Sequence, residues 1–281
     1  MDNIINGLSI VATPIGNLDD ITYRAVKILG ECDIIICENP KHSLKLLNKL
    51  GIKKKLISMH DYNEKQIIDK IKSDLSNKIC VLISDAGAPL ISDPGYKLIQ
   101  YCCENNIFMT SVPGPSSIIP ALQLSGLDIN EFYFAGFAPK TAVQMEKFVA
   151  NINLTKITIV FFVSSHKIKM FLDLMNKLSA DKKLSVCKEL TKLNEKIFRG
   201  NVYDVRNKIL KNNKNLKGEF VVIVEGNSSK KMEFFDLKEH NNIINKMLIN
   251  FSLTDVVEIV HKLTKIPKNK VYKWVLKLKK S

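Results

Sequence analysis

The amino-acid sequence predicts an α/β protein with two sheets and a short helical segment at its C-terminus. Three observations indicate this fold. Short apolar, β-rich runs alternate with stretches whose apolar residues recur at helical spacing, which favours mainly parallel sheets with helices on both sides. The apolar runs divide into two sets, one before and one after the segment SGLDINE. From residue 237 onward, only helical patterns remain.

The predicted strands are continuous apolar runs, the pattern typical of strands that are covered on both faces. The first set lies at residues 8–12, 33–37, 79–84 and 107–112, and the second at 132–135, 157–163, 184–188 and 220–224. Between them lie helical patterns such as the one at residues 67–75. Residues 126–130 interrupt the pattern, so we predict αβα domains at 1–126 and 127–236, and a basic helical segment at 237–281.

Two helices are predicted in that last segment. The first begins after Ser252, and Asp255 three residues later gives it a start that resembles a capping box. Pro267 ends the pattern, and a second helix follows with Val271 and Val275 on its apolar face. This is a helix-turn-helix-like unit. Covering apolar surface of the second domain and contacting RNA are both compatible with it.

The chain carries a net charge of +14, but only three of its 42 basic residues are arginine. An AT-rich genome alone would produce such a lysine bias, so the overall charge is weak evidence for a nucleic-acid partner. The placement of the charge is better evidence. Residues 265–281 contain seven lysines and no acid, as expected of a tail that meets phosphate. The predicted RNA-binding residues are Lys268, Lys270, Lys273 and Lys277.

Several functional classes are not supported by any motif. No 18-residue apolar run and no N-terminal signal sequence occurs, so we expect a cytoplasmic protein without a membrane span. The six cysteines form no CxxC pair and indicate buried free thiols. No metal-site motif is visible, and neither GxGxxG after the first strand nor GxxxxGK[ST] occurs, which argues against dinucleotide binding and phosphate-loop chemistry.

Three loops rich in proline and glycine follow predicted strands, at residues 11–20, 84–95 and 112–122. Open α/β sheets bind their ligands at these carboxyl ends. Proline fixes the backbone and glycine lets it approach a ligand closely. Ser116 or Ser117 can cap a helix whose N-terminal amides face the same crevice. The three loops together predict a stiff, preformed pocket.

These loops carry a family resemblance. The motifs VATPIGNLDDIT, SDAGAPLISDPGY, PGPSS and ELTK resemble the tetrapyrrole-methylase superfamily of S-adenosyl-L-methionine-dependent enzymes, and within it the bacterial 16S rRNA (cytidine 2′-O) methyltransferases. The likeness extends to GEFVVIVEG and to the lysine-rich C-terminal helices. It implies two αβα domains with the cofactor in the cleft between them, a homodimer, and methylation of a ribose 2′-hydroxyl in 16S rRNA of the small ribosomal subunit.

The resemblance also implies a cofactor site. In the family the loop matching residues 87–91 wraps the cofactor with backbone groups. Its sulfonium cation requires neither a phosphate cradle nor a lysine. The implied cofactor-binding residues are Pro14, Asp85, Gly87, Ala88, Ile91, Ser116, Ser117, Phe162, Leu190 and Glu219. For Phe162 and Leu190, a place in the ordinary core is the alternative.

The substrate-facing motifs depart from the family pattern. ENPKH stands at residues 38–42 where the family has Glu-Asp-Thr-Arg-His, and VSSHK stands at 163–167 in place of Glu-Ser-Pro-His-Arg. Two carboxylates are lost. An RNA-binding assembly factor with an eroded catalytic set therefore stays an alternative. A methylase of corrin-type tetrapyrroles is a second alternative, against which the rRNA-type motifs argue.

Glu38, Lys41 and His42 are the predicted catalytic residues, because they follow the second strand at the same edge as the cofactor loops. His42 can accept a proton near neutral pH. Lys41 can hold a phosphate or stabilise a developing oxyanion, and Glu38 can act as a base or orient either neighbour. The alternative is that Lys41 and His42 are solvated residues of a helix start.

Overall fold

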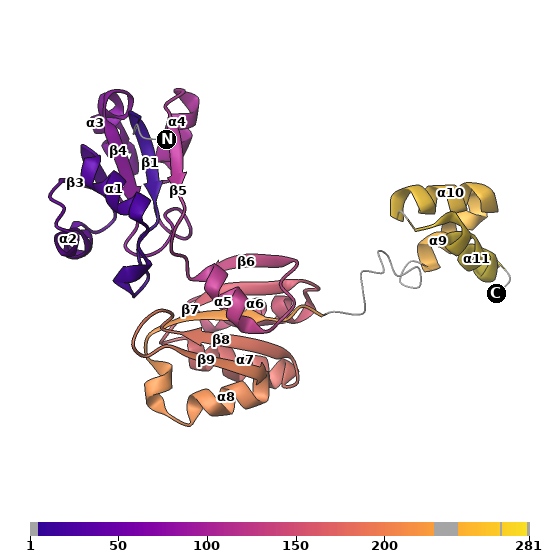
Figure 1. The fold of residues 1–281 in the computed structure, drawn as a ribbon. Coiled ribbons are helices and arrows are strands. Elements are labelled where there is room, and N and C mark those ends of the chain that lie inside the picture. The colour runs from indigo at the N-terminus through magenta and orange to yellow at the C-terminus, as the bar shows by residue number, and fades with distance from the viewer. Residues whose placement is uncertain (1–4, 228–240, 265, 280–281) are drawn as a thin grey trace. The chain divides into compact units, whose positions relative to one another are not determined.

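Figure 1 shows the computed structural model, which describes residues 5–227, 241–264 and 266–279. The chain divides into two compact units, Met1–Asn227 and Ser228–Ser281. The first unit holds two five-stranded sheets, and the described part of the second is helical. The predicted α/β fold is therefore confirmed. The predicted boundary at 236/237 lies outside the described residues.

The first sheet is parallel throughout, in the order β3-β2-β4-β1-β5. Its strands are β1 (Gly7–Val11), β2 (Ile34–Cys37), β3 (Lys55–Ser58), β4 (Ile79–Ile83) and β5 (Met109–Val112). Alternate residues of β2 face opposite sides: Ile34 and Ile36 pack in the core with α3 (Glu64–Asn77) and α4 (Tyr96–Glu104). Ile35 and Cys37 pack with α1 (Tyr23–Glu31) and α2 (Pro40–Lys49). Both faces of the sheet are thus buried.

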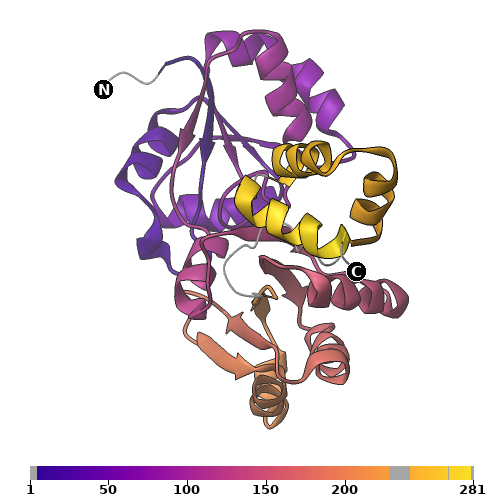
Figure 2. The ribbon, with the colours of Figure 1, turned by 90° about the vertical axis from the view of Figure 1, so that its right-hand side faces the viewer.

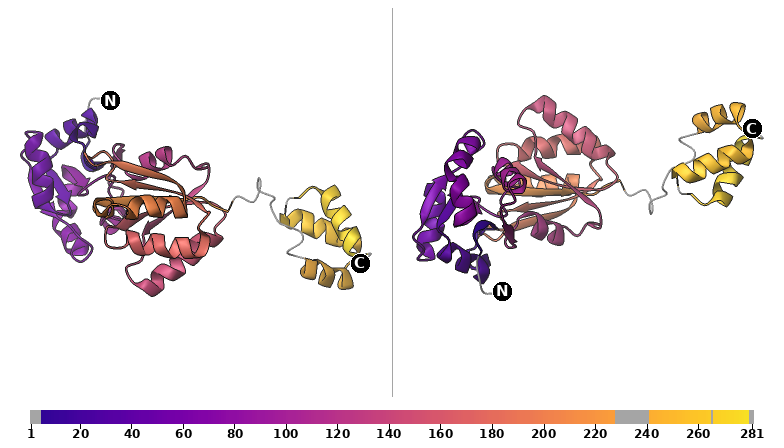
Figure 3. Two further views of the ribbon diagram at one scale, coloured as in Figure 1. Left: turned by 90° about the horizontal axis from the view of Figure 1, so that it is seen from below. Right: turned by 90° about the horizontal axis from the view of Figure 1, so that it is seen from above.

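The second sheet has the order β6-β7-β10-β8-β9. Its strands are β6 (Phe132–Phe137), β7 (Thr158–Ser164), β8 (Lys183–Lys188), β9 (Lys196–Asn201) and β10 (Glu219–Val224). Helices cover both of its faces (Figure 3). One core contains residues of α6 (Ala142–Leu154), α7 (Ile168–Ser179) and α8 (Val202–Leu210), and the other contains residues of α5 (Ile118–Ser125). Two short 3₁₀ helices, η1 (Leu18–Asp20) and η2 (Asn213–Leu216), complete the unit.

The prediction of mainly parallel sheets is wrong for the second sheet, where only β6 and β7 pair in parallel. The reason is one link without a helix. Residues 189–195 join β8 directly to β9, so the chain reverses there, and β9 and β10 run opposite to β6, β7 and β8. β10 then inserts between β7 and β8, which makes three of the four pairings antiparallel.

The eight predicted strands correspond to observed strands, whereas β3 and β9 were not predicted. Both lie at sheet edges, where a strand needs only a short apolar run. β3 begins with Lys55 and follows two further lysines, and most of β9 is only partly buried or exposed. Neither shows the continuous apolar pattern that identified the other strands.

The second unit contains α9 (Asn241–Asn250), α10 (Leu253–Thr264) and α11 (Lys268–Lys279), which pack together as a small bundle (Figure 2). Its own core includes Ile244, Val256, Val260, Val271 and Val275. The predicted cap is confirmed, since the backbone N of Asp255 donates to Ser252 Oγ at 3.2 Å. α9 was not predicted, and its Asn241 accepts a hydrogen bond from Trp274 Nε1 at 3.0 Å.

Two further expectations concern the cysteines and membranes. All six cysteines are free, and five of them are buried, as their apolar surroundings predicted. Across the described parts of the chain, no helix has the length and apolar character that crossing a membrane requires.

Glu64 links the first sheet's helices to the loop that follows β4. Its side chain is only 3% exposed, and Oε1 accepts a hydrogen bond of 3.0 Å from the backbone N of Leu98. Leu98 lies in the first turn of α4, which begins directly after the loop of residues 84–95. Glu64 therefore satisfies an N-terminal amide of α4 and places a negative charge at the positive end of its dipole.

We expect Glu64→Ala to lower the free energy of unfolding by about 1–3 kcal/mol, because the buried amide of Leu98 loses its acceptor. Urea denaturation of the full chain measures this. Glu104→Ala is the matched control, since it removes an exposed glutamate from the C-terminal end of α4, the helix whose N-terminal end Glu64 contacts. Equal effects of the two substitutions would contradict a role for Glu64 in holding α4.

Candidate functional site

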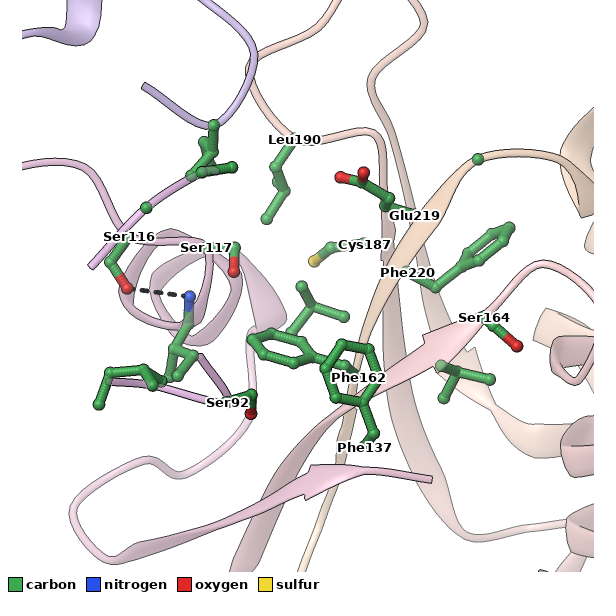
Figure 4. Close-up of a pocket in the computed structure, with 18 of the residues that line it drawn as sticks. Ser92, Ser116, Ser117, Phe137, Phe162, Ser164, Cys187, Leu190, Glu219 and Phe220 are labelled. Carbon is green, nitrogen blue, oxygen red and sulfur yellow. Dashed lines mark hydrogen bonds between the residues drawn. The ribbon is translucent and has the colours of Figure 1, made fainter. Parts of the chain in front are cut away.

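A cavity of about 420 Å³ lies where the edges of the two sheets of the first unit meet (Figure 4). One side is formed by the loops that follow β1, β4 and β5, all at carboxyl ends of parallel strands. The other side is formed by the carboxyl ends of β6 and β7, by residues in and just after β8, and by the start of β10. The predicted position of the pocket, at the carboxyl ends of the strands, is what an open α/β sheet favours.

The chain reversal explains why β10 contributes its first residues to this edge. β10 runs opposite to β7 and β8, so its amino end lies beside their carboxyl ends. Phe162 pairs with Val221, and Glu219 pairs with Ser164. Glu219 therefore reaches the same cavity wall as Phe162, although it begins a strand rather than ends one.

The first two loops are tied together by their backbones. Thr13 and Gly87 exchange both main-chain hydrogen bonds, each 2.9 Å long. Thr13 Oγ1 also donates to the carbonyl oxygen of Ser84 at 3.3 Å. Gly87 has φ of +82°, a conformation that favours glycine, and Leu90 and Ser92 each adopt φ of +72°. These bonds and dihedral angles hold the loop in one shape, as the proline and glycine content predicted.

The third loop is capped by a serine. The backbone N of Ile118, the first residue of α5, donates to Ser116 Oγ at 3.3 Å (Figure 4). Ser117 makes no side-chain capping bond. Of the two predicted capping residues, Ser116 is thus the one that caps, and the side chains of both line the cavity.

The loop after β8 closes the site from the second sheet. Its residues Glu189 and Thr191 have φ of +51° and +64°, conformations that are uncommon outside glycine. Thr191 Oγ1 accepts a hydrogen bond of 3.1 Å from the backbone N of Asn17, in the loop after β1. Gly16 packs so closely that an added Cβ would overlap Lys192 Cγ and lie 2.9 Å from Thr191 Oγ1. The loops of the two sheets therefore touch here.

A charged network supports this loop. Lys192 Nζ lies 3.1 Å from Glu189 Oε1 and 2.9 Å from Glu219 Oε2. The backbone N of Glu219 donates to Glu189 Oε1 at 2.9 Å. Burial lowers the pKa of Lys192, but its bonds to Glu219 and Glu189 outweigh that effect and raise it. Lys192 therefore stays protonated and joins the loop to the start of β10.

Eight of the ten predicted cofactor-binding residues line this cavity: Gly87, Ala88, Ile91, Ser116, Ser117, Phe162, Leu190 and Glu219. Pro14 and Asp85 do not line it. Asp85 Oδ1 is buried and has no hydrogen-bond partner among the described residues. Phe162 both lines the cavity and packs against Phe134 and Phe137, with ring centroids 5.1 and 5.0 Å away, so it belongs to the cavity wall and to the core at once.

Other cavity residues were not predicted, notably Phe137, Ser92, Asp93, Ser164, Ser165 and Cys187. Phe137 ends β6, and the rule that directed attention to carboxyl ends of the first sheet's strands applies equally to it. Asp93 lies in the same loop as Gly87. Burial raises the pKa of Cys187 to about 11, so this thiol stays protonated in the wall.

The three predicted catalytic residues lie outside the cavity lining. Glu38 is half-buried after β2, and its pKa is raised by burial and by the charges of Asp85 and Asp61. Lys41 and His42 are exposed in the first turn of α2. Their backbone amides both donate to Oδ1 of Asn39, which caps that helix. The structure thus places Glu38 with the carboxylate of Asp85, and Lys41 and His42 on the surface of a helix start.

The predicted RNA-binding lysines all lie on α11 and are exposed. Lys270, Lys273 and Lys277 follow one another at intervals of three and four residues, so they share one side of the helix. Val271 and Val275 occupy the buried side. The charge of Lys268 acts on Glu258 of α10 and lowers the pKa of that carboxyl, as the charge of Lys262 does more strongly.

Comparison with solved structures supports the same architecture. A uroporphyrin-III-C-methyltransferase from Thermus thermophilus aligns with a TM-score of 0.55 at 15% identity, covering 79% of this chain and 94% of that one. A cobalt precorrin-4 methyltransferase aligns with a TM-score of 0.55 at 17% identity, covering 78% and 94%. At these identities the likeness establishes the fold.

Residues 7–206 match the model of the family described as Tetrapyrrole (Corrin/Porphyrin) Methylases, and the chain belongs to this family of methyltransferases. The resemblance seen in the loop motifs is thereby confirmed. Relatives with higher sequence identity carry the name ribosomal RNA small subunit methyltransferase I. The one from Halalkalibacterium halodurans is 38% identical over 79% of this chain and 77% of its own length. The one from Buchnera aphidicola is 36% identical over 97% and 96%.

The contact between the loops after β1 and β8 can be tested by replacing each of two glycines with alanine. We expect Gly16→Ala to lower the free energy of unfolding by about 1–3 kcal/mol, because its methyl group must displace Thr191 or the Lys192 side chain. Gly30→Ala is the control, since nothing lies within 4 Å of the added methyl group in α1. That change should stabilise by about 0.5–1 kcal/mol. Urea denaturation that gave both variants the same sign would contradict the contact.

Proposed function

We propose that this methyltransferase transfers the methyl group of S-adenosyl-L-methionine to the ribose 2′-hydroxyl of a cytidine in 16S rRNA of the small ribosomal subunit. The observation that carries the proposal is the chemistry of the cavity wall. Among its described lining residues, Asp93, Cys187 and Glu219 are ionisable, and none is a lysine, arginine or histidine. The relatives' names support an rRNA substrate.

The residues present fit this cofactor. A cavity of about 420 Å³ has the size of a site for a nucleoside-containing molecule. Phe162, Leu190 and Ile118 would give apolar walls for the adenosine, and the backbone of Gly87 and Ala88 would approach it closely. Asp93 has no lysine, arginine or histidine beside it in the described lining and suits a ligand that carries a sulfonium and an ammonium group, whereas Glu219 is already paired with Lys192. When bound, the cofactor supplies an electrophilic methyl group.

The protein's own contribution is then positioning and proton removal. The rigid loops would hold the acceptor oxygen in line with the methyl carbon and sulfur, so the bimolecular step becomes effectively intramolecular. The apolar walls would keep water from competing with the ribose hydroxyl. A hydroxyl of this kind is a poor nucleophile at neutral pH, so a nearby base must take its proton.

We assign the RNA contacts to two surfaces. The lysines of α11 would bind phosphates without reading sequence, which suits a segment whose contribution is affinity. Lys41 and His42 are exposed at the carboxyl edge of the first sheet and would meet RNA that reaches the cavity. Methylation of purified small subunits with labelled cofactor tests the whole proposal. Cofactor binding without transfer would instead identify an assembly factor.

The cofactor assignment is tested by replacing each of two glycines with leucine. We expect the wild-type chain to bind S-adenosyl-L-methionine at micromolar Kd, about −8 kcal/mol, by calorimetry. Gly87→Leu should abolish binding, because its side chain would occupy the cavity beside Ile15. Gly51→Leu is the matched control: it places the same residue at φ of +70°, in open space outside the cavity. Loss of binding in both variants, or in neither, would place the site elsewhere.

The RNA assignment is tested by charge removal. We expect the double variant Lys270→Gln with Lys273→Gln to bind RNA more weakly. The slope of log K against log salt concentration should become shallower by about 1.5. Lys246→Gln with Lys262→Gln removes the same charge from the other two helices of the unit and should change the slope far less. Binding to a 16S rRNA fragment at several salt concentrations measures both. Identical slopes for the two double variants would refute the role of α11.

A further inference from the structure

Asp93 stands apart from the other ionisable groups of the cavity wall. Cys187 keeps its proton because burial raises its pKa to about 11. Glu219 is 80% exposed and lies 2.9 Å from Lys192 Nζ, so it is a solvated, paired carboxylate. Asp93 is partly buried, and none of the described residues that line the cavity with it is a lysine, arginine or histidine. It is therefore the remaining wall residue able to take up a proton near neutral pH.

The loop holds Asp93 in a defined position. It follows Ser92, whose φ is +72°, and precedes the Pro94–Gly95 pair that starts α4. Gly95 has φ of +128°, and an added Cβ would lie 2.8 Å from Leu90 Cδ2. The end of the loop is also fixed, because Glu64 accepts a hydrogen bond from the first turn of α4. A carboxyl group on such a loop is preorganised rather than free to swing.

Three groups face the Asp93 carboxyl. Burial raises the pKa of Asp93 to about 6, the charges of Glu38 and Asp85 raise it as well, and a hydrogen bond from Ser84 lowers it. Behind them, Asp61 and His60 act on Glu38. Burial and like charges thus oppose ionisation of Asp93. A carboxylate in such surroundings is a stronger base than an exposed one, and it is still mostly ionised at pH 7 to 8.

We propose that Asp93 is the catalytic base that accepts the ribose hydroxyl proton, with Glu38 behind it as a positioning residue. This inference rests on the proposed function. The hydroxyl oxygen forms its bond to the methyl carbon while the carbon–sulfur bond breaks and leaves its electron pair on sulfur. The hydroxyl proton passes to the Asp93 carboxylate and then to solvent. Charge is conserved, since one cation is neutralised as one proton is released.

Single-turnover methylation of small subunits at saturating cofactor tests the role in catalysis. Asp93→Asn should lower the rate about a hundredfold or more, while calorimetric cofactor affinity stays within a few-fold. Asp69→Asn is the control, because it removes an exposed carboxylate of α3 outside the cavity and should transfer at the wild-type rate. A near-normal rate in Asp93→Asn would overturn the inference. Absence of transfer by the wild-type chain would instead refute the proposed function.

The pH dependence separates the base from its neighbour. The wild-type rate should fall below about pH 6, where Asp93 is protonated. Glu38→Gln removes a negative charge near Asp93, so it should keep most of the activity and shift this fall to lower pH. If Glu38→Gln abolishes transfer and Asp93→Asn does not, Glu38 is the base and the inference is wrong.

Thermal unfolding gives a readout that needs neither cofactor nor RNA. The folded-state pKa of Asp93 is raised, so its contribution to stability is fully present below the unfolded value near 4 and is lost as pH rises through about 6. Asp93→Asn cannot ionise. The Tm of Asp93→Asn minus that of the wild type should therefore increase by about 2 °C or more between pH 5 and 7.5. A difference that does not change with pH would contradict the environment on which the inference depends.

Discussion

The helix-free link between β8 and β9 is the constraint on which the cavity depends. Everywhere else in the first unit, a helix connects successive strands, and within each sheet the helix-linked strands run in the same direction. At residues 189–195 the chain turns back without a helix, so β10 returns against β7 and β8. An amino end of a strand, with Glu219, thereby joins an edge made otherwise of carboxyl ends. A fully parallel second sheet would leave that wall without Glu219.

The same link also connects the two sheets. Glu189 and Thr191 adopt left-handed backbone conformations, and Thr191 Oγ1 accepts a hydrogen bond from the backbone N of Asn17. Lys192 joins this link to β10 through ion pairs with Glu189 and Glu219. The same loop after β1 is tied to the loop after β4, where Thr13 and Gly87 pair by backbone hydrogen bonds. The loops that border the cavity thus support one another, through backbone bonds between Thr13 and Gly87 and through the side chains of Thr191 and Lys192. The backbone pairing changes little when side chains vary, which would suit the cofactor site proposed for this cavity.

Much of this arrangement could be predicted from the sequence, because buried strands and proline-glycine loops have strong local patterns. The loops around Gly87 and Ser116 were found in this way, and both line the cavity. The edge strands β3 and β9 could not be found, since their residues are exposed or only partly buried and show no continuous apolar run. Strand direction, and with it the place of β10, depends on tertiary pairing that no local pattern records. A role for Asp93 as a base was not predicted, because its raised pKa comes from burial and from the charge of Glu38, neither of which the local sequence shows.

The distribution of charge follows from the two tasks proposed for the chain. Lysines are abundant, yet the described cavity wall contains none, and its carboxylates face a space suited to a cationic ligand. The exposed lysines of α11 belong instead to a unit with its own apolar core. Placing a lysine in the wall would repel a sulfonium and would also lower the basicity of Asp93. Phosphate binding and methyl transfer therefore demand opposite local charge, and separate parts of one chain can supply both without compromise.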